Sequence, residues 1–367
     1  MTNRLIRCAA AVGVFTVALV IQAVPASASS PPAHRPIYMA DANHQGAASL
    51  QPPPVCCLPI PQDVTGPLPV PAMVNMAYFG GHVQVAPKIY LVLWGWGETG
   101  AFDHANPGMP ASDPDGAGQR MLNFIKALGG TTWAGVQTQY YETVNGTNTT
   151  ISNPANQFGG VWYDNTNPIH DNLADIELAQ EAQRAVAHFG TTGLLNSQFI
   201  IATPQKDNAA GFNSGAGYCA WHDYTVPSVY PGVQQGISFT NMPYVLNLGE
   251  SCGEHSVNAG YWAGLLDGFT IVLGHEIEET VTDPGAEETA ADGTQLGAWF
   301  DFAGWENGDK CAWTGDTFGL TNPTVFPGGL NNIKGNDGKL YPVQSLWSND
   351  AAGGAGYCAG NGNDLPF

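Results

Sequence analysis

The sequence is short of charge, and of positive charge above all. Only 11% of the 367 residues are Asp, Glu, Lys or Arg, against about 25% in typical soluble domains. Eleven Lys+Arg face 31 Asp+Glu, a formal net charge of −20. So acidic a chain excludes binding to nucleic acid, or to an anionic membrane, through a bulk basic field. Gly (46) and Pro (27) are abundant instead, which indicates a loop-rich protein.

Long apolar runs are also scarce. The one that is present, Cys8–Val24, follows the basic residues Arg4 and Arg7 and precedes the A-x-A sequence Ala26–Ala28. This pattern is typical of a signal peptide, here residues 1–28. No later run is long enough to span a bilayer. We therefore expect a secreted, extracellular protein with no membrane partner once the signal is removed.

Several familiar motifs are missing. The chain has no G-x-S-x-G sequence, no Walker A loop and no dinucleotide fingerprint. It also has no C-x-x-C spacing, which argues against a cysteine zinc site. Six cysteines follow the signal, and an even number in an exported chain indicates disulfides. Six cysteines allow 15 pairings; proximity in sequence favours Cys219–Cys252 and Cys311–Cys358. Cys56 and Cys57 are then left to pair internally, to pair with another chain, or to leave with a propeptide.

The rest of the chain divides in two. Residues 29–74 are rich in proline and show no strand or helix periodicity, so we interpret them as a linker or propeptide. Residues 75–367 form the expected folded domain. Its apolar patterns predict four strands and three helices: strands over 88–94, 197–203, 218–224 and 243–248, and helices over 117–128, 173–189 and 266–282. A loop-rich C-terminal part follows, with a short strand over 340–346.

The third predicted helix carries the most informative sequence, His275-Glu276-Ile277-Glu278-Glu279. It has the spacing of the H-E-x-x-H zinc motif, with Glu279 in place of the second histidine. Residues four apart lie on one helix face, so His275 and Glu279 can be metal ligands and Glu276 a general base. Apolar residues at the same spacing predict a buried back face, with the polar face toward a cleft. Pro284 should end the helix. The alternative is an acidic helix end without a metal.

A catalytic zinc site needs a third protein ligand. We assign it to Glu306, with Asp309 as the alternative; a simple turn at Asn307-Gly308-Asp309 would explain the same residues. One neutral histidine and two carboxylates leave a Zn²⁺ site formally uncharged, which weakens the Lewis acid. Such oxygen-rich ligation keeps Mn²⁺ and Ca²⁺ open beside Zn²⁺. The order of the elements is compatible with an α/β fold consisting of a single zincin-like domain, with a mixed sheet behind the metal helix.

Several segments in order resemble one family. They are Tyr78–Gly81 with Lys88–Gly95, Gly217–His222, His275–Pro284, Ala298–Asp301, Glu306–Cys311 and Val343–Asn349. Together they are similar to the phosphate-induced, exordium-like extracellular proteins of plants and their bacterial relatives, over residues 76–358. The family motif E-I-G-D-x-C has Asn307 here in place of Ile. The resemblance implies an exported, disulfide-bonded protein with a zincin-like metal helix.

Three functions stay open. The first is a secreted metal-dependent hydrolase, a zincin-like peptidase that acts on a peptide or cell-wall-associated substrate. The second is a non-catalytic extracellular or wall-associated signalling or binding protein with a structural metal. The third is a carbohydrate-active protein that uses Glu276 and Glu306 as an acid/base pair. His222, on the strand over 218–224, could bind substrate or orient an oxyanion; its alternative is a packed or exposed bystander.

Overall fold

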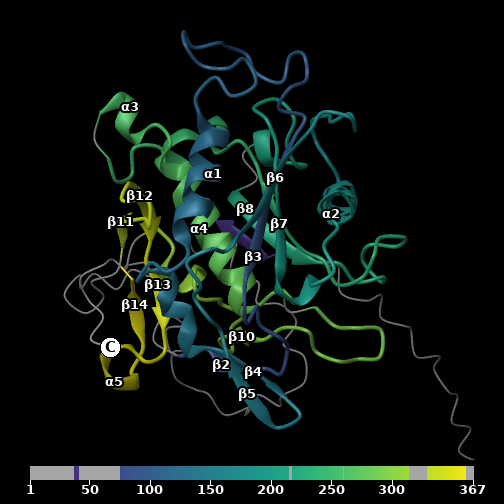
Figure 1. Cartoon of the computed structure of the whole chain (residues 1–367), viewed down its shortest axis with the longest axis vertical. Coiled ribbons are helices and arrows are strands. Elements are labelled where there is room, and N and C mark those ends of the chain that lie inside the picture. Colours follow the sequence, from purple (N-terminus) through teal and green to yellow (C-terminus); the bar gives the residue numbers. More distant parts are fainter. Residues whose placement is uncertain are drawn as a thin grey trace, which may run out of the picture. The chain divides into compact units, whose positions relative to one another are not determined.

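The computed structural model describes residues 37–40, 75–214, 217–258, 260–286, 288–313 and 329–360 (Figure 1). The predicted signal peptide, Cys56 and Cys57, and most of the predicted linker lie outside these residues. The boundaries predicted for the three parts of the chain therefore stay predictions.

A six-stranded mixed sheet organises the described residues, in the order β1-β8-β9-β7-β3-β6. Strands β3, β6, β7 and β9 run parallel, whereas β8 is antiparallel to β9, and β1 is antiparallel to β8. The bounds are β1 Ile37–Ala40, β3 Lys88–Trp94, β6 Phe158–Asp164, β7 Ser197–Ala202, β8 Tyr218–Tyr224 and β9 Ser238–Met242. The α/β class and the mixed sheet are confirmed.

The strands predicted over 88–94, 197–203 and 218–224 are confirmed, but the one over 243–248 is wrong. The strand lies just before it, at β9, and ends at Met242 because Pro243 has no N–H to continue the ladder. Residues Val245–Asn247 form a 3₁₀ turn instead. Strand β1 lies inside the segment 29–74, whose sequence shows no strand periodicity.

Three long helices cover the sheet: α1 Ala117–Leu128, α2 Asp175–Phe189 and α4 Asp267–Thr282. All three were predicted from their periodicity, within two residues at each end. Side chains alternate along β7, so that Ile200 joins the core under α1 and α4, while Phe199 and Ile201 join the core under α2. The sheet therefore lies between α2 on one face and α1 with α4 on the other (Figure 1).

Helix α4 departs from the expected amphipathic pattern. All 16 of its residues are buried, the charged ones included. Its apolar side packs toward the sheet as predicted, but its polar side is covered by β12 (Leu340–Gln344) and by the segment around Asp309–Cys311 rather than facing an open cleft. The helix ends at Thr282, two residues before Pro284, as expected.

Short elements complete the fold. They are β2 Ala77–Tyr78, β4 Tyr141–Val144, β5 Thr147–Thr150, α3 Tyr261–Gly264, β10 Trp299–Phe300, β11 Leu330–Lys334, β13 Leu346–Ser348, α5 Ala351–Gly354 and β14 Tyr357–Ala359. Both predicted disulfides are present: Cys219–Cys252, with Cα atoms 5.5 Å apart, and Cys311–Cys358, with Cα atoms 5.6 Å apart. They join β8 to the segment before α4, and the segment after Glu306 to β14. Disulfides indicate an oxidising compartment.

Candidate metal centre

The centre is built on the second half of α4. His275 and Glu279 lie one helical turn apart, so their side chains meet: His275 Nε2 is 3.0 Å from Glu279 Oε2. Glu276 is the next residue along the helix and points toward β8, where its Oε2 is 3.1 Å from Nδ1 of His222. All four side chains are fully buried. Helical spacing thus brings together the three residues that the motif predicted.

Two other segments supply the remaining polar groups. Strand β8, which packs against α4, contributes His222. The loop that leads into a 3₁₀ turn at Asp309–Cys311 contributes Glu306 and Asp309. Two sets of three side chains result, each with ligand atoms close enough to hold one metal ion: His222, Glu279 and Glu306, and His275, Glu279 and Asp309. Glu279 belongs to both.

The environment of His275 fixes its tautomer. Its Nδ1 lies 3.2 Å from Oε1 of Gln344, whose own Nε2 donates to the carbonyl oxygen of Gly308 at 2.7 Å. Because Oε1 of Gln344 must therefore accept, Nδ1 of His275 carries a proton, and Nε2 is the nitrogen that can hold a second proton or a metal ion. That Nε2 finds no hydrogen-bond partner among the described residues, although it faces Glu279 and Asp309. A buried imidazole nitrogen turned toward carboxylates is a position that either a proton or a metal cation stabilises.

His222 repeats the arrangement. Its Nδ1 faces Oε2 of Glu276, so the carboxylate holds the proton on Nδ1, as the carboxylates behind metal-bound histidines do. Its Nε2 lies 3.5 Å from Oε2 of Glu306 and, within the described part of the chain, makes no hydrogen bond. Two independent imidazoles thus present Nε2 to carboxylates while Nδ1 is held from behind.

The distances between ligand atoms within each set are close to those around a single cation. Bonds of about 2.0–2.1 Å from a tetrahedral zinc ion place neighbouring ligand atoms about 3.3–3.4 Å apart. The measured separations are 3.0 Å for His275 and Glu279, 3.6 Å for His275 and Asp309, and 3.5 Å for His222 and Glu306. Small side-chain movements would bring each set to the required distance. Nitrogen and carboxylate donors suit zinc and also manganese, so the donors do not fix the identity of the metal.

The charges of the group are strongly coupled. Burial, the largest single effect, lowers the pKa of His275, but the neighbouring carboxylates of Glu279, Glu276 and Asp309 together outweigh it and raise the pKa to about 10. Burial is also the largest single effect on Glu279 and favours its neutral form, but His275, His222 and the backbone N–H of Asp309 together lower the pKa of this carboxyl. The pKa of Asp309 is raised well above its ordinary value by burial and then by the charge of Glu279. Protons thus offset part of the negative charge, and a divalent cation would do the same.

The two residues predicted as candidates for the third ligand lie in different sets. Asp309, the alternative, lies with His275 and Glu279, whereas Glu306, the first choice, lies with Glu279 and His222. Sequence reasoning left His222 between substrate binding and a bystander role, and the structure buries it in the centre. The position of His222 in the centre could not be predicted, because a strand pattern does not reveal which helix the strand packs against.

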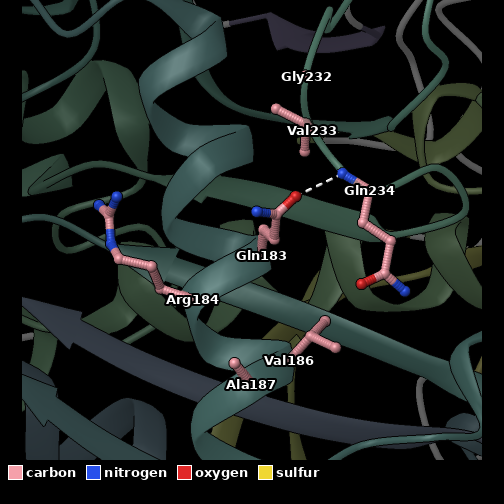
Figure 2. Close-up of a pocket in the computed structure, with 7 residues that line it drawn as sticks. All are labelled: Gln183, Arg184, Val186, Ala187, Gly232, Val233 and Gln234. Carbon is pink, nitrogen blue, oxygen red and sulfur yellow. Dashed lines mark hydrogen bonds between the residues drawn. The ribbon is translucent and has the colours of Figure 1, made fainter.

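Two hollows of the surface lie apart from the centre. Figure 2 shows the groove between α2 and the loop before β9, lined by Gln183, Arg184, Val186, Ala187, Gly232, Val233 and Gln234. A second hollow involves His104 and Tyr244 among others. Neither includes a residue of the candidate metal centre. Within the centre, Asp309 is the residue that reaches the surface, with 11% of its side chain exposed.

Comparisons with known proteins do not assign the chain to a family. No family model matches the chain, and no curated protein or solved structure matches it. A search of the described residues finds no helix with the length and apolar character of a membrane span. What the chain has is a buried group of histidine, glutamate and aspartate side chains that could hold a metal ion.

Proposed function

We propose that the protein is a secreted metal-dependent hydrolase that cleaves peptide bonds, a relative of the exordium-like extracellular proteins with a zincin-like helix. The observation that carries the proposal is the pair of buried imidazoles, His222 and His275, whose Nε2 atoms face carboxylates without a hydrogen bond among the described residues. Burying such groups is costly unless something binds them.

We assign the hydrolytic ion to the set of His275, Glu279 and Asp309. These are three protein ligands, the number that leaves a coordination position open. Asp309 is also the member of this set that reaches the surface. When bound, a divalent cation supplies Lewis-acid activation of water and of the substrate carbonyl.

Glu276 is placed to move the proton. Its Oε2 is held by His222, while its Oε1 makes no hydrogen bond to any described residue. Burial raises the pKa of this carboxyl, although the hydrogen bond to His222 opposes the shift, and a raised pKa favours proton uptake by a general base. In hydrolysis, Oε1 takes one proton from water, the water oxygen bonds to the carbonyl carbon, the C–N bond breaks, and the proton passes to the departing amine.

One observation favours a second function, a non-catalytic extracellular protein with a structural metal. Five of the six residues in the centre are fully buried, and structural metal sites are closed whereas catalytic sites are open. In this case the ion would hold α4, β8 and the loop at Glu306 together without turnover.

The test is metal content together with turnover. The secreted full chain should contain a bound transition metal by elemental analysis and should cleave an unfolded protein substrate, and a chelator should abolish cleavage reversibly. Glu279→Gln should lose the metal, whereas the surface variant Glu254→Gln should retain it. A chain that neither contains metal nor takes up Zn²⁺ or Mn²⁺ would rule out both functions. Bound metal without turnover would leave the structural function.

A further inference from the structure

The outer edge of β8 is occupied by the chain's own N-terminal segment. Strand β1 pairs with it in antiparallel register, with Ile37 opposite His222 and Met39 opposite Ala220. Among the described residues, β1 is the element that precedes residue 75, and it lies within the segment 29–74 that the sequence marks as a linker or propeptide. Figure 1 draws it in purple, beside α4.

The pairing includes a side-chain socket. Met39 is fully buried and joins the core cluster that contains Ala220 of β8 and Phe269, Leu273 and Ile277 of α4. Ala220, the residue opposite, is small and leaves room on this face of the sheet. Methionine is unbranched and flexible, so it fills such a space without a strict fit.

The same edge runs along the candidate metal centre. His222 belongs to β8, and its imidazole reaches Glu276 and Glu306. A chain paired with β8 therefore passes within one strand spacing of the centre. Without β1, the N–H and C=O groups of this edge would be unpaired, which is how peptide-binding domains receive an extended ligand.

We infer that the outer edge of β8 is the binding site for an extended peptide, seated in place of β1, with an unbranched apolar side chain in the Met39 socket opposite Ala220. Resting on the proposed function, this inference makes the substrate an extended polypeptide and makes residues 37–40 an internal occupant of the substrate site. Backbone pairing supplies affinity that is independent of sequence, and the socket supplies selectivity at one position.

The test uses the full-length chain and a labelled synthetic peptide with the sequence of residues 35–42, in the presence of a chelator so that nothing is cleaved. Met39→Asp should displace β1, because a carboxylate cannot enter the apolar socket. This variant should bind the peptide, while the unaltered chain, whose site is filled, should bind it at least about tenfold more weakly. A peptide with Asp at the Met39 position should bind the variant roughly 10–100-fold more weakly, the range for burying a methionine side chain.

Two measurements keep the inference open to refutation. Leu340→Asp makes the same kind of change at a side chain that is 57% exposed, and should bind the peptide as weakly as the unaltered chain does. If Met39→Asp does not fold, Met39→Ala weakens the same contact more gently. Hydrogen exchange should show β8 amides exposed in the variant and protected again by the peptide. Exposed amides without peptide binding would overturn the inference.

The outcomes separate the two proposals. Peptide binding by a chain that proves inactive with every metal would sustain this inference and remove the hydrolase function. Turnover of a protein substrate that the 35–42 peptide does not inhibit in Met39→Asp would sustain the function and remove the inference.

Discussion

Substitutions of Glu276 can separate two roles of its carboxylate, which orients His222 and is the proposed general base. One oxygen accepts a hydrogen bond from Nδ1 of His222 at 3.1 Å, and the other is the proposed proton acceptor. In Glu276→Gln the amide oxygen can still accept from His222, but the side chain cannot take a proton. We expect metal affinity to stay within a few-fold, and turnover to fall by about 10²–10⁴-fold, the usual contribution of a general base.

Glu276→Ala removes both the hydrogen-bond acceptor for His222 and the proposed proton acceptor. His222 loses the group that orients it, and such losses typically weaken metal binding by about 10–100-fold, here at the set of His222, Glu279 and Glu306. Glu278→Gln is the matched control, since Glu278 is the neighbouring buried glutamate and lies outside both candidate ligand sets. Burial raises the pKa of Glu278 to about 8, so this side chain is mostly protonated at pH 7 and glutamine resembles it closely. Its turnover should be unchanged.

The assay pairs peptide hydrolysis at saturating metal with metal titration by calorimetry on the three variants and the unaltered chain. Full turnover in Glu276→Gln would refute the role of Glu276 as the base. Equal metal binding by Glu276→Ala and the unaltered chain would show that the set of His222, Glu279 and Glu306 does not hold a metal ion that depends on the carboxylate behind His222.

Three further predictions concern other parts of the fold. A Cβ atom at Gly308 would lie 2.9 Å from both Glu279 Oε1 and His275 Nδ1, so Gly308→Ala should weaken metal binding by about 10–100-fold, while Gly193→Ala, with open space around it, should leave calorimetric affinity unchanged. Burial raises the pKa of Glu181 to about 7, because its effect is larger than the opposing effect of Arg184. The protonated side chain therefore contributes its full stabilisation below about pH 4.5, and this contribution is lost as the pH rises to 7. Urea unfolding of Glu181→Gln across that range should recover up to about 3 kcal/mol, and a pH profile parallel to that of the unaltered chain would contradict the assignment. Replacing Cys311 and Cys358, 47 residues apart, by serine should lower the free energy of unfolding by about 4 kcal/mol in the chain-entropy picture, and an unchanged midpoint would show that the loop is constrained by other contacts.

Local patterns in the sequence predicted much of the fold. The strand over Lys88–Trp94 is a near-continuous apolar run, and the helix over Ala117–Leu128 repeats its apolar residues every three to four positions; both appear with the predicted bounds. Proximity in the chain was enough for the two disulfides. A pattern of this kind depends only on neighbours in sequence, which is why it transfers directly to the structure.

Features that depend on contacts between distant parts of the chain could not be predicted from the sequence. β1 has four residues, too few to show alternation, and its position follows from the unpaired edge of β8. The division of Glu306 and Asp309 between two histidines depends on a single turn of 3₁₀ helix after Gly308. His222 gained its significance from the packing of β8 on α4. In each case a pairing across the fold, rather than the local residue type, decides the outcome.

The complete burial of α4 has a consequence for how this chain can vary. Helix α1 leaves Gln119 and Lys126 in solvent, and α2 does the same with Gln180 and Ala187, so both helices offer positions where substitutions cost little. Across Asp267–Thr282 no such position exists among the described residues. A saturation scan should therefore show periodic tolerance along α1 and α2, but one unbroken block of 16 intolerant positions along α4. Adaptation to new substrates would have to proceed through the strands and loops around this helix, with the helix itself held fixed.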